Sequence, residues 1–129
     1  MSKKADKYLE LSQQLLTDFD KAKKADVSSR TLYNRLYYAC FNAANAVLAS
    51  KDLEAKTHAG VADKLFTEIY EDSDLISKQT AAFLSIIQTK RDISDYELEM
   101  KEDKEELKEI ETEAKEFIEQ MREVVKSNR

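Results

Sequence analysis

The chain has 129 residues, of which 42% are hydrophobic and 36% charged, and this indicates a single globular domain with a charge-rich surface. One glycine and no proline argue against β-hairpins and open sheets, while a single cysteine and a single histidine argue against an internal disulfide and a thiolate or histidine metal site. The net charge of −5 is uneven, because residues 97–123 hold twelve acids and five bases, which makes this segment a poor surface for a phosphate backbone.

The first predicted helix spans Lys4 to about Lys24, with its apolar residues on one face. Three lysines lie near its end, where the helix dipole favours cations: Lys21, Lys23 and Lys24. A solvated helix end explains them more simply than a phosphate contact does.

The central predicted helix runs from Arg30 to Ala49 and is apolar on nearly all its faces, which indicates neighbours on several sides. Three polar side chains, Arg35, Tyr38 and Asn42, recur along it at steps of three and four, so they share a face. Such a line is either a structural polar seam or one wall of a binding site.

Three further helices are predicted after a charged linker. One runs from His58 to about Tyr70, the next ends near Asp92, and the last begins at Asp103 or as early as Tyr96. Residues that can accept hydrogen bonds from free N–H groups mark the helix starts: Asp26, Ser28 or Ser29, then Thr57, then Ser73 or Asp74, and finally Asp103.

Together these elements predict an all-α protein in which residues 1–129 form one domain, an antiparallel up-and-down bundle of four long helices plus one short helix. No apolar run approaches the ~20 residues of a membrane span, and the N-terminus lacks the apolar core of a secretion signal. We therefore expect a cytoplasmic protein with no membrane segment, in which Cys40 is a buried thiol.

Outside the central helix, the candidates for chemistry are His58, Arg91, Asp95 and Tyr96. Arg91 and Asp95 are four residues apart, so a local ion pair is the simplest interpretation. Arg91 and Tyr96 do not share a face of a continuous helix and converge only if the helix ends between them. The sequence has no Gly-rich phosphate loop, no Cys-x-x-Cys and no Glu-x-x-His pair, so we expect neither a metal nor a cofactor.

Three motifs resemble those of the HEPN (higher eukaryote and prokaryote nucleotide-binding) proteins, especially the small stand-alone members often encoded beside a minimal nucleotidyltransferase. They are residues 34–39 (NRLYYA), 56–60 (KTHAG) and 91–96 (RDISDY). Each motif alone is weak, but the three stand in the expected order and spacing, and the resemblance runs from about Asp26 to Ile118.

The resemblance implies a helical homodimer, with a site commonly built across the dimer interface, and many members are metal-independent ribonucleases that use an arginine and a following histidine. Such cleavage needs a base for the 2′-hydroxyl proton and a cation for the phosphoryl oxygens. Arg91 matches the arginine, but Tyr96 stands in place of the histidine, and a phenol is a poor base at neutral pH. Asn42 likewise stands where many relatives carry a histidine.

The first hypothesis is a HEPN-type protein that acts with a nucleotidyltransferase partner, as a toxin or as a nucleotide- or RNA-binding subunit. Its phosphate-binding cleft is expected to be lined by Arg35, Tyr38, Asn42, Arg91 and Asp95. In some toxin–antitoxin pairs the partner transfers nucleotides onto a tyrosine near this motif, and Tyr96 is the nearest candidate.

Two alternatives stand beside it. One is an active ribonuclease, with Arg91 stabilising charge and His58 or Tyr96 moving the proton. The other is a purely structural bundle. Under the first two we expect Arg91 and Arg35 to face a common groove open to solvent, within one subunit or between subunits, rather than to be neutralised by Asp92 or Asp95.

Overall fold

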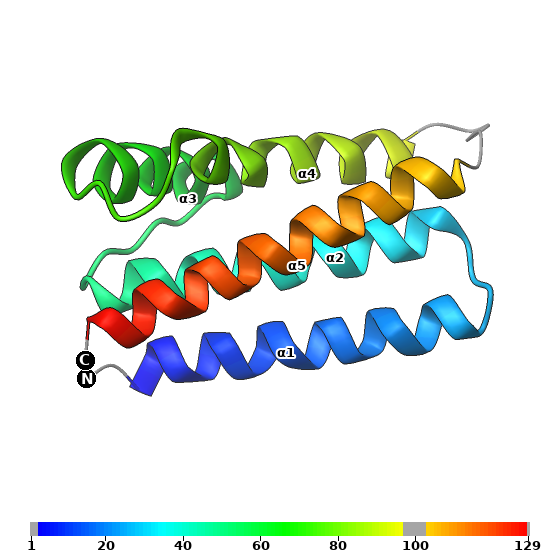
Figure 1. Ribbon diagram of the computed structural model, residues 1–129, viewed down its shortest axis with the longest axis horizontal. Helices are drawn as coiled ribbons and strands as arrows, with labels where there is room; N and C mark the ends of the chain where they lie inside the picture. The colour runs from blue at the N-terminus through cyan, green and yellow to red at the C-terminus, as the bar shows by residue number, and fades with distance from the viewer. Residues whose placement is uncertain (1–2, 97–102, 129) are drawn as a thin grey trace.

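The computed structural model describes residues 3–96 and 103–128. In this part of the chain the regular structure is helical throughout: α1 (Lys3–Lys24), α2 (Ser29–Ser50), α3 (His58–Lys64), the π-helix η1 (Leu65–Asp72), α4 (Lys78–Tyr96) and α5 (Lys104–Ser127). The four long helices alternate in direction, and α3 and η1 connect α2 to α4 along the chain (Figure 1). The predicted antiparallel bundle is confirmed. In the described ranges, every helix is too short or too polar to cross a membrane.

Helix α2 is the centre of the bundle and packs against α1, α3, α4 and α5. Its apolar side chains are buried on nearly every side, including those of Leu36, Tyr37 and Val47. A buried hydroxyl joins α2 to α1, because Ser12 Oγ donates to the Ala39 carbonyl at 2.7 Å. The central position that the all-round apolar sequence predicts is therefore confirmed.

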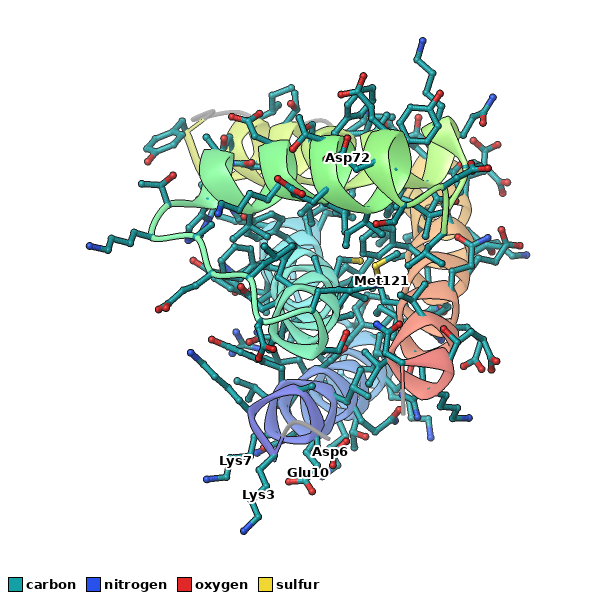
Figure 2. All side chains as sticks on the ribbon, turned by 90° about the vertical axis from the view of Figure 1, so that its left-hand side faces the viewer. Lys3, Asp6, Lys7, Glu10, Asp72 and Met121 are labelled. Atoms are coloured by element: carbon teal, nitrogen blue, oxygen red, sulfur yellow. The ribbon has the colours of Figure 1, made fainter. Side chains whose placement is uncertain are left out.

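The side chains sort by polarity around this centre. Met121 of α5 points into the interior, whereas Lys3, Lys7 and Glu10 of α1 project outward (Figure 2). The buried set includes apolar residues of every helix, so one core holds the described chain together.

Three of the predicted helix caps are confirmed. Ser28, Thr57 and Asp103 accept hydrogen bonds from backbone N–H groups three residues later, at 3.3, 2.9 and 3.0 Å. These bonds satisfy N–H groups that a helix start leaves without an intrahelical partner.

The predicted bounds of the fourth helix are wrong at both ends. Asp74 has φ of +50°, in the left-handed region, and its N–H donates to the Tyr70 carbonyl, so it closes η1 instead of capping the next helix. The cap of α4 is Ser77, whose Oγ accepts from the Thr80 N–H at 3.0 Å. At its other end α4 continues past Asp92 to Tyr96, since neither glycine nor proline interrupts it.

Candidate functional site

Side chains from α2, α3 and α4 meet where the three sequence motifs converge. The Tyr37 hydroxyl lies 2.6 Å from His58 Nδ1, and Arg91 Nη1 donates to the Tyr38 hydroxyl at 3.1 Å. We call Tyr37, Tyr38, His58 and Arg91 the Arg91 cluster. Residues that lie 54 positions apart in the chain thus meet in one polar group, which the sequence alone did not establish.

The helix arrangement explains this convergence. Helices α2 and α4 are antiparallel, and Arg30 Nε donates to the Ser94 carbonyl at 2.5 Å, which aligns the start of α2 with the end of α4. Tyr37 and Tyr38, about two turns further along α2, contact Arg91 of α4. His58 is the first residue of α3, and the capping bond of Thr57 fixes that helix start.

Gly60 lies in the same first turn of α3. Its N–H donates to Thr57 Oγ1 at 2.9 Å, and a Cβ at this position would lie only 2.9 Å from that oxygen. Glycine therefore permits the close approach of the capping hydroxyl that holds His58 at the cluster.

Aromatic rings surround both the cation and the imidazole. The Arg91 guanidinium carbon lies 4.7 Å from the ring centroid of Tyr37 and 5.6 Å from that of Tyr38, within the range of cation–π attraction. The His58 ring stacks on Phe41, with 4.4 Å between the centroids. Phe41 is a member of the site that the sequence analysis missed, although its spacing of four from Tyr37 places both on one helix face.

Arg91 is held in place by two aspartates as well. Asp92 Oδ1 accepts from Arg91 Nη2 at 2.6 Å and from Nε at 3.1 Å, while Asp95 Oδ2 lies 3.9 Å from Nε. Burial opposes the charged form, but the hydrogen bond and the charge of Asp92 raise the pKa of Arg91 above its ordinary value. The predicted pair with Asp95 is present, and Arg91 does not meet the expectation that it escapes neutralisation by Asp92.

Three of the five N–H donors of Arg91 are used, two by Asp92 and one by Tyr38. The other two have no hydrogen-bond partner among the residues that the structure describes, and the side chain is 16% exposed. The guanidinium therefore keeps donor capacity for an oxygen that approaches from solvent.

The protonation states of His58 and Tyr37 follow from their surroundings. Burial and the positive charge of Arg91 lower the pKa of His58, against an opposing effect of Asp92. Burial raises the pKa of Tyr37 far above its ordinary value. At neutral pH the pair is thus a neutral imidazole beside a protonated phenol, and the imidazole can accept a proton.

The structure brings together four of the side chains that the sequence analysis selected. Tyr38, His58 and Arg91 lie in the cluster, and Asp95 lies at its edge through its ion pair with Arg91. Asp92 also contacts Arg91 and was considered only as a neutralising residue.

Three other candidates have different neighbours. Arg35 Nη1 donates to Asn34 Oδ1 at 3.0 Å, and the described contacts of Arg35 include no member of the Arg91 cluster. Asn42 is buried, and its amide donates to the Tyr38 carbonyl of its own helix at 2.8 Å. Tyr96 is 83% exposed, and α4 continues through it, so the condition under which Tyr96 would converge with Arg91 is not met.

In residues 3–96 and 103–128, no group of three or more histidine, cysteine, aspartate or glutamate side chains is placed to hold a metal ion.

No protein-family model matches the chain, and no curated protein sequence matches it either.

Proposed function

We propose that the chain is a HEPN-type protein that acts with a nucleotidyltransferase partner, as a toxin or as a nucleotide- or RNA-binding subunit. We further propose that it is a homodimer and that the Arg91 cluster binds a phosphate group of its ligand. One observation supports this above all: the three motifs that carry the resemblance contribute Tyr37 and Tyr38, His58, and Arg91 to a single site.

Arg91 is suited to the phosphate-binding role because two of its donors are open in the described part of the chain, while Asp92 and Tyr38 hold its plane still. A planar guanidinium binds two phosphate oxygens at once, and preorganisation lowers the entropic cost of binding. The carboxylates of Asp92 and Asp95 oppose an anion, so the proposal predicts modest affinity.

The second candidate function is metal-independent cleavage of RNA, and the position of His58 favours it. In that reaction His58 takes the proton of a 2′-hydroxyl, the 2′-oxygen bonds to the adjacent phosphorus, and the bond to the 5′-oxygen breaks, with that oxygen taking a proton from water. The products are a cyclic phosphate and a 5′-hydroxyl, and Arg91 stabilises charge on the phosphoryl oxygens.

Binding is tested by the fluorescence anisotropy of labelled ATP and of labelled single-stranded RNA, with Arg91→Lys and Arg91→Ala as variants. Arg91→Lys keeps the charge but loses the two-pronged geometry, so both variants are expected to weaken binding. Arg122→Ala, a change at a partly exposed arginine of α5, is the matched control. Equal affinity of the wild-type protein and folded Arg91→Lys contradicts the proposal and favours the purely structural bundle.

Catalysis is tested separately by incubation of the pure protein with RNA in EDTA. RNA cleavage by the wild-type protein that is lost in Arg91→Ala and His58→Gln supports the ribonuclease. Wild-type cleavage no greater than that of the two variants excludes it.

The partner is tested by co-expression with any nucleotidyltransferase encoded beside this chain, followed by intact-mass measurement. An added nucleotide mass that disappears in Tyr96→Phe supports modification of the exposed tyrosine. Sedimentation of the purified protein tests the homodimer.

A further inference from the structure

A groove lies between α4 and α5 and begins about one helical turn along α4 from Lys90, whose ion pair with Glu106 joins these antiparallel helices. It consists of two adjoining hollows of about 410 and 510 Å³. Thr80 and Gln120 line both hollows and hydrogen-bond to each other at 2.8 Å. The groove follows α5 over residues 113–127, a length of about 21 Å. We call it the α4–α5 groove.

The floor and one wall of the groove are apolar or uncharged. The rings of Phe83 and Phe117 pack together with 5.6 Å between their centroids, and both line the first hollow. Ile86 on the α4 wall is 47% exposed, and Leu75 at the other end of the groove is 38% exposed. Large apolar side chains that line a surface groove and remain open to water are typical of a protein-binding site.

The α5 side of the groove is acidic. Four glutamates follow it: Glu113, Glu116, Glu119 and Glu123. Glu119 Oε2 lies 3.8 Å from Arg122 Nε, and Glu123 Oε1 lies 3.9 Å from Lys126 Nζ. Both glutamates are more than half exposed, so both ion pairs are weak. Glu113 and Glu116 form no ion pair within the part of the chain that the structure describes. The residues that line the α4 wall carry no charge.

We propose that the α4–α5 groove binds an amphipathic helix of a partner protein, with apolar side chains on one face and lysines or arginines along one edge. An occupant of about four turns matches the length of the groove. Its apolar face covers Phe83, Ile86 and Leu75, and its basic edge meets the row of glutamates. This charge pattern favours a basic helix over a second copy of the chain, because two-fold pairing of this surface brings two acidic rims into one interface.

The test uses a fluorescein-labelled synthetic helix of leucine and lysine, 18 residues long, and a second peptide in which glutamate replaces every lysine. Anisotropy is measured with the wild-type protein, with Ile86→Glu and with the double variant Glu113→Lys, Glu116→Lys. The matched controls on α1 are Leu11→Glu, at a site 43% exposed, and Glu10→Lys, whose side chain projects outward in Figure 2.

We expect the lysine peptide to bind and the glutamate peptide not to bind. Ile86→Glu and the double reversal are each expected to weaken binding on the order of ten-fold, and the controls less than about two-fold. Binding that the controls weaken equally, or that the groove variants leave unchanged, overturns the proposal. A wild-type dimer that Ile86→Glu converts to a monomer in sedimentation overturns it as well, because the groove is then a contact between copies.

Discussion

Replacement of Tyr37 by phenylalanine removes one hydroxyl from the Arg91 cluster and leaves the ring in place. The ring is fully buried and contacts Tyr38, Phe41 and the Arg91 guanidinium, and phenylalanine keeps these contacts. The change therefore isolates the 2.6 Å hydrogen bond between Tyr37 and His58.

The expected cost follows from what the substitution leaves behind. A net hydrogen bond contributes about 1 kcal/mol, and a buried polar atom left without a partner adds about 1–3 kcal/mol. Because His58 is only half-buried, water recovers part of the second contribution. We expect the free energy of unfolding to fall by about 1.5 kcal/mol and the midpoint of thermal unfolding by roughly 5 °C.

Tyr38→Phe provides the matched comparison on the next residue. Among the described residues, the Tyr38 hydroxyl accepts only from Arg91, which keeps two bonds to Asp92, and Tyr38 is partly exposed. We expect this variant to cost about 0.5 kcal/mol or less. Urea unfolding followed by circular dichroism measures both variants. Equal costs, or a cost of Tyr37→Phe below about 0.5 kcal/mol, would refute the reasoning that the Tyr37–His58 bond holds α3 to α2.

Three other predictions concern stability, protonation and reactivity. His58 is the only histidine, so its single imidazole resonance reports its pKa, which we expect below the ordinary 6.5 and higher in Arg91→Gln than in the wild type. The imidazole takes up its proton at a higher pH in the unfolded chain than in the folded protein, so the free energy of unfolding should fall as the pH drops from 6.5 through the lower pKa of the folded state. His58→Gln should make this fall smaller. A wild-type pKa of His58 at or above 6.5 contradicts this. Ser12→Ala should cost about 1 kcal/mol in urea unfolding, since it removes the buried bond to the Ala39 carbonyl, and an unchanged stability contradicts this. Cys40 is fully buried, and burial raises its pKa, so it should react with a disulfide reagent only after unfolding; rapid reaction in the native state contradicts this.

The architecture could be predicted because apolar spacing and capping residues are local signals. The start of α4 could not be chosen from them, since Ser73, Asp74 and Ser77 are all able to cap a helix. The choice depends on the left-handed backbone at Asp74 that ends η1. This conformation belongs to the closure of the preceding π-helix, a feature for which the sequence gives no clear signal.

The candidate site was predictable to the extent that its contacts are local. The pair of Arg91 and Asp95 follows from their spacing of four, and it is present. The bond between Tyr37 and His58 depends on how α3 crosses α2, so spacing within either helix cannot reveal it. Tyr96 points elsewhere because α4 does not end before it.

The charge of the molecule limits what kind of anion suits the proposed site. Figure 2 places the segment that leads to α3 and the acidic helix α5 on opposite sides of α2. Most glutamates of α5 are exposed, so salt screens their repulsion of an anion at the cluster, and Glu106 at the start of α5 is paired with Lys90. Attraction at the cluster comes from Arg91, and Asp92 offsets much of it. A site with one partly compensated cation binds a single phosphate group, as in a nucleotide, better than a long RNA backbone, whose affinity grows with each neutralised phosphate.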